Sequence, residues 1–216
     1  MKIVSELMHE IGQIFLVPCI VILLLFLLIT LLQVGGLAIE YFAEWRKLKV
    51  NMPQLLDKLH GKDVKQLHDI IMASGLRPRQ KKTIFALLDS DLPDAERLAL
   101  ARNLLSVEER YYEKGTAITD LIAKLGPMFG LLGTLIPLGP GIVALGEGNT
   151  EMLSESLGIA FDTTILGLLA AAGCYTISRV RSGWYGKYLS ITETLMECLL
   201  EEMKGKENPV DRGSEA

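Results

Sequence analysis

Three long apolar stretches constrain this chain more than any other feature of its sequence. Residues 11–39 and 125–146 contain no charged side chain, and residues 156–178 contain only Asp162. A helix needs about 20 apolar residues to cross the hydrocarbon core of a bilayer, and each stretch is long enough. The sequence therefore predicts an all-α membrane protein with three transmembrane helices at these positions.

The remaining segments are polar, and we expect them to lie outside the bilayer. In chain order they are an outer N-terminal segment (1–10), a cytoplasmic helical region (40–124), an outer loop (147–155), a cytoplasmic C-terminal helix (179–206) and a disordered tail (207–216). Within the helical region, the patterns predict helices over 63–73 and 78–88 and a long helix from about residue 93. That long helix is expected to run directly into the second apolar stretch.

The basic residues predict the orientation of the chain. Residues 44–124 hold fifteen Lys or Arg and residues 179–216 hold six, whereas residues 146–155 hold none. Because cytoplasmic segments of membrane proteins are enriched in Lys and Arg, the N-terminus is predicted outside and the C-terminus in the cytoplasm. The expected location is the cytoplasmic (inner) membrane.

The second and third apolar stretches are rich in small residues. Gly126, Gly130, Gly133 and Gly141 follow one helical stripe, which favours close contact between helices. Gly158 and Gly167 are the corresponding packing candidates in the third stretch.

Pro137, Gly139, Pro140 and Gly141 predict an irregular outer half of the second stretch. Irregular backbone is not tolerated against lipid, so this half is expected to face protein or a water-filled cavity.

Two threonines are predicted to lie at the same depth. Thr134 follows Lys124 by ten residues, which is about 15 Å at the helical rise. Thr164 follows Glu155 by nine residues, or roughly 13–14 Å from the opposite side. Both therefore come near the middle of a core about 30 Å thick and could form a polar ring in an oligomer. The alternative is that each hydroxyl bonds to its own helix and only assists packing.

Asp162 is the one acid predicted at lipid depth, about 10 Å into the third span. No Lys or Arg lies at that depth, so the acid should be protonated, hydrated or hydrogen-bonded to a neighbour. A proton or cation relay and a structural interface acid both remain open. Asp162 and Thr164 lie about 200° apart around a helix, with Thr163 between them, so both cannot face one narrow pore. Thr163 is nevertheless included with Thr134 and Thr164 as a candidate for the ion pathway.

This part of the chain resembles the MotA/TolQ/ExbB proton-channel family, closest to its TolQ/ExbB branch. In the second stretch the resemblance rests on Gly126-Pro127 and on the segment Gly130-Leu-Leu-Gly133-Thr134. In the third stretch the matching residues are Gly158-Ile-Ala160, Thr164, Gly167 and the run Ala170-Ala171-Ala172. The resemblance covers about residues 120–180, while residues 1–115 match only in architecture.

The resemblance implies a homopentamer whose second and third helices line a central pore. Inside it would sit a dimer of a single-span ExbD- or TolR-like partner whose intramembrane Asp takes the ion. Thr134 and Thr164 match the pore threonines, and the transported ion is H⁺ or Na⁺, with no other cofactor. The assembly would be an ion-driven motor that does mechanical work on an envelope process. TolQ- and ExbB-like sequences place a Glu where this chain has Ile159, and Asp162 stands nearly one turn later.

Other classes of function receive little support from the sequence. The net charge of −4 indicates no nucleic-acid partner. Three widely spaced cysteines indicate neither a disulfide framework nor a metal site. No nucleophile–base pair or phosphate loop is found in 44–124, so an enzyme is not expected. The alternative function is a non-conducting membrane scaffold packed through its small residues.

Overall fold

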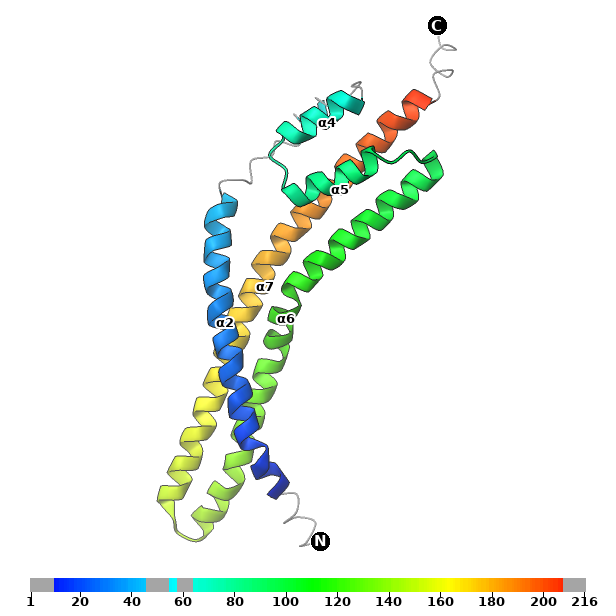
Figure 1. Cartoon of the computed structure of the whole chain (residues 1–216). Coiled ribbons are helices and arrows are strands. Elements are labelled where there is room, and N and C mark those ends of the chain that lie inside the picture. Colours follow the sequence, from blue (N-terminus) through cyan, green and yellow to red (C-terminus); the bar gives the residue numbers. More distant parts are fainter. Residues whose placement is uncertain (1–9, 46–54, 58–63, 208–216) are drawn as a thin grey trace. The chain divides into compact units, whose positions relative to one another are not determined.

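The computed structural model describes residues 10–45, 55–57 and 64–207, and the regular structure within them is entirely helical (Figure 1). Its principal helices are α2 (Leu16–Trp45), α4 (Val64–Ala73), α5 (Pro78–Leu88), α6 (Asp94–Gly146) and α7 (Thr150–Glu207). Three helical segments, Glu10–Tyr41, Asp94–Gly146 and Thr150–Lys204, are long and apolar enough to cross a membrane. The all-α class and the three candidate spans are thus confirmed. The predicted N-terminal segment, apart from Glu10, and the predicted tail, apart from Glu207, lie outside the described residues.

The chain divides into two compact units. The first, here called the spanning unit, comprises Met1–Glu40 and Thr116–Arg181. The second, here called the extramembrane unit, comprises Tyr41–Gly115 and Ser182–Ala216. Helices α6 and α7 contribute to both units without a break in either helix, as the sequence predicted for the long helix that begins near residue 93.

The connection between α6 and α7 is shorter than the predicted loop 147–155. Only residues 147–149 are non-helical, and Gly148 adopts a φ of 80°, which glycine tolerates without strain. The Asn149 side chain then accepts a hydrogen bond of 3.1 Å from the backbone N–H of Met152 and caps the first turn of α7. The polar composition of residues 150–155 therefore marks an exposed helical turn, and the prediction of a longer loop was wrong.

The predicted irregular outer half of the second span was also wrong, because α6 continues as a helix through Pro127, Pro137 and Pro140. Proline cannot donate the backbone hydrogen bond of an α-helix, so Pro140 leaves the carbonyl of Ile136 without its usual partner. The Gln13 side chain donates a hydrogen bond of 3.3 Å to that carbonyl. A neighbouring polar side chain thus satisfies the backbone group that the proline releases, as membrane helices require.

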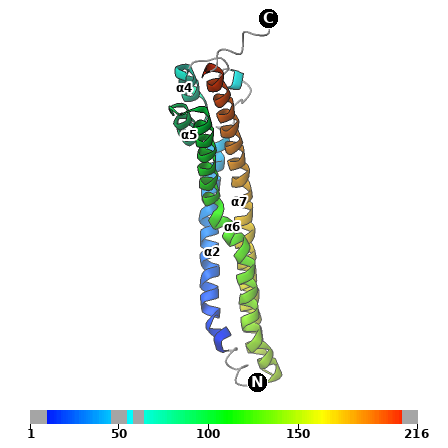
Figure 2. The same ribbon diagram turned by 90° about the vertical axis from the view of Figure 1, so that its right-hand side faces the viewer.

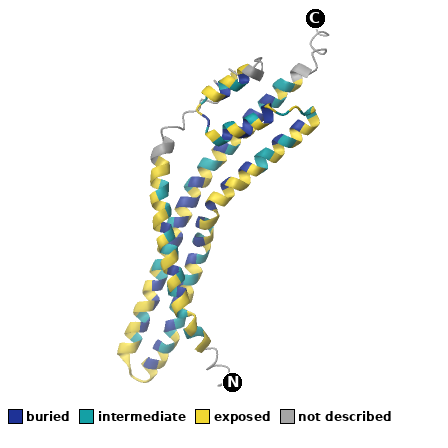
Figure 3. Ribbon diagram, viewed as in Figure 1, coloured by how far each residue is buried: buried dark blue, intermediate teal, exposed yellow. Residues whose placement is uncertain are grey.

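In the spanning unit, α2 packs against α6 and α7 through its buried face. The Thr30 hydroxyl lies 3.2 Å from the sulfur of Cys174, and the Phe26 ring meets Phe129 edge-on at 5.8 Å. The Cys19 thiol donates to the carbonyl of Phe129 at 3.2 Å. Many apolar side chains of the other faces are exposed, and Figure 3 shows exposed residues along all three helices. That pattern suits contact with lipid or with further protein chains.

A buried arginine joins α2 and α7 at one end of the spanning unit. The guanidinium of Arg181 donates from Nε to Glu40 at 3.0 Å and from Nη1 to Gln33 at 2.8 Å. The Arg181 side chain is only 8% exposed, while that of Glu40 is 46% exposed. The charge is therefore buried but compensated by two groups of one helix.

We expect Glu40→Ala to destabilise the spanning unit by about 1–2 kcal/mol, less than the ~3–5 kcal/mol typical of a fully buried pair, because solvent reaches Glu40. The measurement is the midpoint of unfolding in mixed micelles of a mild detergent and SDS. The control is Arg181→Met combined with Glu40→Ala, which removes both charges and should recover part of the loss. Equal stability of Glu40→Ala and the parent would show that the pair contributes nothing.

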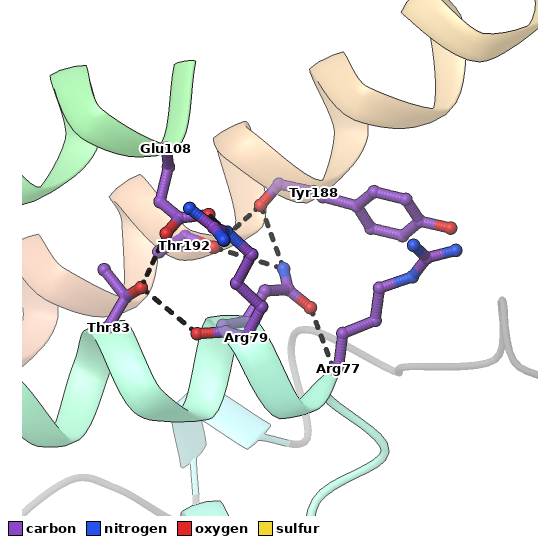
Figure 4. Close-up of polar contacts among 7 residues, drawn as sticks. Arg77, Arg79, Thr83, Glu108, Tyr188 and Thr192 are labelled. Carbon is purple, nitrogen blue, oxygen red and sulfur yellow. Dashed lines mark hydrogen bonds and ion pairs between the residues drawn. The ribbon is translucent and has the colours of Figure 1, made fainter. Parts of the chain in front are cut away.

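In the extramembrane unit, α4 and α5 pack on the last part of α7 around a hydrophobic cluster. Its buried members are Leu55, Leu67, Ile71, Leu76, Ile84, Leu88, Leu195 and Leu199. The same unit contains a group of polar contacts (Figure 4). Glu108 accepts hydrogen bonds from Thr83 at 3.0 Å and Arg79 at 2.8 Å, and Gln80 donates to Tyr188 and Thr192. Because these buried polar groups find partners, they add directional bonds to an apolar core.

Candidate functional site: a small-residue helix pair and its threonines

Helices α6 and α7 approach so closely in the spanning unit that their backbones touch. They lie side by side there in both Figure 1 and Figure 2. A Cβ atom added at Gly126 would lie 2.7 Å from the carbonyl oxygen of Gly167, and one added at Gly167 would lie 2.6 Å from that of Gly126. Side chains larger than hydrogen do not fit at such separations. The two helix backbones can approach this closely because Gly126 and Gly167 have no side chains, as in other small-residue pairs of membrane helices.

The other glycines of the predicted stripe lie along the same contact. A Cβ atom added at Gly130 would lie 3.4 Å from the Cα of Thr164. One added at Gly133 would lie 2.7 Å from the Cβ of Thr163, and one added at Gly141 would lie 3.0 Å from the Cβ of Ser156. Gly158 differs, because an added Cβ there would meet no atom of the chain within 4 Å. The structure thus gives Gly158 no packing role within one chain.

Gly158 therefore provides a matched control for the contact. We expect Gly167→Ala to destabilise the protein by about 1–3 kcal/mol, because the new methyl group clashes with backbone that cannot move aside cheaply. Gly158→Ala should be neutral or stabilising, since alanine favours the helix by up to about 1 kcal/mol. Unfolding midpoints in mixed micelles measure both effects. Tolerance of Gly167→Ala equal to that of Gly158→Ala would contradict the contact.

Thr163 lies inside this contact. Its side chain is 3% exposed and occupies the space beside Gly133. Its hydroxyl donates to the carbonyls of Ile159 and Ala160, both at 2.9 Å. The hydroxyl is therefore directed into its own helix, and we leave Thr163 out of the ion pathway proposed below.

Thr134 and Thr164 lie at the edge of the contact and are half-buried. The Thr134 hydroxyl donates to the Leu131 carbonyl at 2.6 Å, and that of Thr164 reaches the Gly130 carbonyl at 3.5 Å. In this conformation Thr134 makes the local bond that the packing alternative predicts. Gly133 of α6 lies beside Thr163 of α7, and the two helices run in opposite directions. Thr134 and Thr164 each follow by one residue, so their levels along the helices differ by about 3 Å. This agrees with the similar depths expected from the sequence.

Both threonines lie on the side of the helix pair that α2 leaves open. Helix α2 contacts α6 at Phe129, and Thr134 follows five residues later, about 140° further around the helix. On α7, Thr30 of α2 bonds to the Ala170 carbonyl, and Thr164 precedes Ala170 by six residues, about 120° around. One side of the α6–α7 pair is thus covered by α2, and the other presents the two threonines.

Asp162 is exposed on a third face of α7. Its neighbours Phe161 and Ile165 are also more than half exposed. Within the described residues, Asp162 has no hydrogen bond or ion pair. An acid at this position in a lipid-depth helix needs a partner from outside the chain or from water.

Sequence reasoning did not single out Asp120 and Ser178, whose side chains are hydrogen-bonded to each other in the spanning unit. Their positions carried a usable signal, since each lies 14 residues from one of the two threonines.

The described residues contain no cluster of three metal-ligating side chains. In the extramembrane unit, burial raises the pKa of the Cys198 thiol, and Glu202 and Glu201 raise it further. Its thiol therefore lacks the lowered pKa of an activated nucleophile.

Comparison with known sequences decides the family. The sequence pattern of the MotA/TolQ/ExbB proton channel family matches residues 63–193, more than half of the chain. The chain belongs to this family. The match begins well before residue 120, so it includes α4 and α5 as well as the helix pair recognised from its motifs. The family is one of proton channels and not of enzymes.

Two relatives represent different branches of the family. Motility protein A of Borreliella burgdorferi is 32% identical over 117 residues, covering 53% of this chain and 40% of the relative. Biopolymer transport protein exbB1 of Vibrio cholerae is 30% identical over 93 residues, covering 41% of each protein. The chain thus spans about two fifths of the length of each. The exbB1 match and the three candidate spans are consistent with the TolQ/ExbB branch.

Proposed function

We propose that this chain is the channel subunit of an ion-driven membrane motor, assembled as a ring of five copies around a central pore. The supporting observation is the position of Thr134 and Thr164, at nearly one level on the side of the α6–α7 pair that α2 leaves open. In a ring, that side faces the axis and α2 faces lipid. Leu28, Leu31 and Leu32 of α2, all more than half exposed, suit the lipid-facing position.

The proposed assembly requires a second protein that supplies the ion-binding acid. The second and third spans, residues 125–146 and 156–178, contain a single carboxylate. It belongs to Asp162, which lies on a different face from the two threonines. The acid on the threonine face should therefore come from a single-span ExbD- or TolR-like partner, present as a dimer inside the ring. Proton flow, or Na⁺ flow, between the partner's Asp and the threonines would drive work on an envelope process.

The proposed location is the inner membrane, with the N-terminus outside and the extramembrane unit in the cytoplasm. The support is the distribution of Lys and Arg, which cluster in residues 44–124 and after residue 178. The proton gradient across that membrane would be the energy source.

The decisive experiment is co-expression with the single-span partner, followed by native mass measurement and proton flux in vesicles. We expect Thr134→Val combined with Thr164→Val to lower the flux at least about tenfold, because valine keeps the shape but removes both hydroxyls. The matched control is Thr176→Val, since Thr176 is an exposed threonine of α7 that bonds to the Ala172 carbonyl at 2.9 Å. It lies about 120° around the helix from Thr164.

A stable complex with the partner that conducts neither H⁺ nor Na⁺ would reject the channel and favour the non-conducting scaffold, which needs the glycine contact but neither threonine hydroxyl. Undiminished flux in the double valine variant would instead remove Thr134 and Thr164 from the ion pathway of a working channel.

For Asp162 we propose an interface role between neighbouring copies, because its face of α7 is exposed and points away from the threonine side. Asp162→Ala should weaken the ring by about 1–3 kcal/mol per interface, since its hydrogen-bond partner loses the carboxyl group. The measurement is the temperature at which the ring dissociates in detergent, with Glu155→Ala as the control. A normal dissociation temperature with flux abolished would assign Asp162 to the ion relay instead.

A further inference from the structure

The side of the helix pair that presents the threonines has a second polar group nearer the extramembrane unit. Asp120 precedes Thr134 by 14 residues on α6, and Ser178 follows Thr164 by 14 residues on α7. Fourteen residues correspond to about 21 Å along the helix and bring a side chain to within about 40° of its starting direction. Asp120 and Ser178 therefore lie on the threonine side, at the end of the spanning unit opposite the α6–α7 turn.

Asp120 and Ser178 are joined directly. The Ser178 hydroxyl donates a hydrogen bond to the Asp120 carboxylate, which links α6 to α7. Ser178 is buried and Asp120 is half-buried, so water still reaches the carboxylate. A partly hydrated carboxylate held by a hydroxyl is a suitable acceptor for a proton or a small cation.

A positive charge follows Ser178 directly along α7. Arg179 is fully exposed, donates from Nε to the Tyr175 hydroxyl at 3.2 Å, and interacts electrostatically with Asp120. Lys124 is one turn from Asp120 on α6 and is also exposed. Within the described part of the chain, neither cation forms an ion pair with Asp120, so the carboxylate stays available for transient binding of a transported cation.

We infer that Asp120, which accepts a hydrogen bond from Ser178, receives the transported cation at the extramembrane end of the threonine side. The inference rests on the proposed channel function. A proton that has passed the threonines binds a carboxylate oxygen of Asp120 and then leaves to water, which regenerates the carboxylate in every cycle. Among the described residues, Asp120 is the first acid on this side after the threonines.

The variants separate this role from a simple brace between two helices. Asp120→Asn keeps an oxygen that can accept the Ser178 hydrogen bond but removes the charge. Ser178→Ala removes the hydrogen bond but keeps the carboxylate. Asp120→Glu keeps the acid on a longer side chain. Glu96→Gln is the control, because Glu96 is an exposed acid of α6 that lies in the extramembrane unit.

The experiment measures proton flux per assembled complex in vesicles that contain this chain and its single-span partner. We expect Asp120→Asn to lower the flux at least about tenfold, with Asp120→Glu, Ser178→Ala and Glu96→Gln within about twofold of the parent. Parent-level flux in Asp120→Asn would overturn the inference. So would an equal loss in Ser178→Ala and Asp120→Asn, or failure of Asp120→Asn to assemble, since both indicate a structural brace.

The outcome for Asp120 is distinct from that for the channel itself. A parent complex without flux rejects the proposed function. Loss of flux in the double threonine variant, together with normal flux in Asp120→Asn, rejects only the role of Asp120.

Discussion

The contact between the backbones of Gly126 and Gly167 is the constraint on which the spanning unit depends. Each glycine occupies the space that a side chain of the other would need, so the contact tolerates neither a larger residue nor a shift of register. In a bilayer, apolar side chains gain little from leaving lipid, and close packing of small residues takes the place of the hydrophobic effect. The register fixed here determines which polar groups of α6 and α7 share a level.

Polar side chains of α2 complete the arrangement by occupying one side of the pair. Thr30 bonds to the carbonyl of Ala170, and Gln33 and Glu40 hold Arg181. Gln13, three residues before α2, bonds to the carbonyl that Pro140 releases. Each bond satisfies a polar group that lipid could not satisfy. The threonine side stays free because α2 is bound elsewhere, and both proposals concern that free side.

The sequence was sufficient to predict the spans, the helix pair and the long continuous helix, because apolar length and glycine spacing report directly on membrane helices. It was insufficient at three kinds of position. The helical state of residues 137–141 depends partly on Gln13, which is more than a hundred residues away in the chain. The first turn of α7 depends on the cap at Asn149, and its polar composition resembles a loop. The direction of the Thr163 hydroxyl depends on which of two adjacent threonines meets Gly133, and periodicity does not resolve one residue.

The bonds near the two ends of α2 also bear on how the protein meets membranes of different thickness. Gln13, just before α2, bonds to α6, and Glu40, towards the other end of α2, bonds to Arg181 of α7. With both ends fixed, α2 cannot slide along its neighbours to match a thinner or thicker hydrocarbon core. The three helices must accommodate the mismatch together, by a common tilt or by local deformation of the lipid. Bilayer thickness would then act on the angle of the helix pair, and through that angle on the width of any pore between copies.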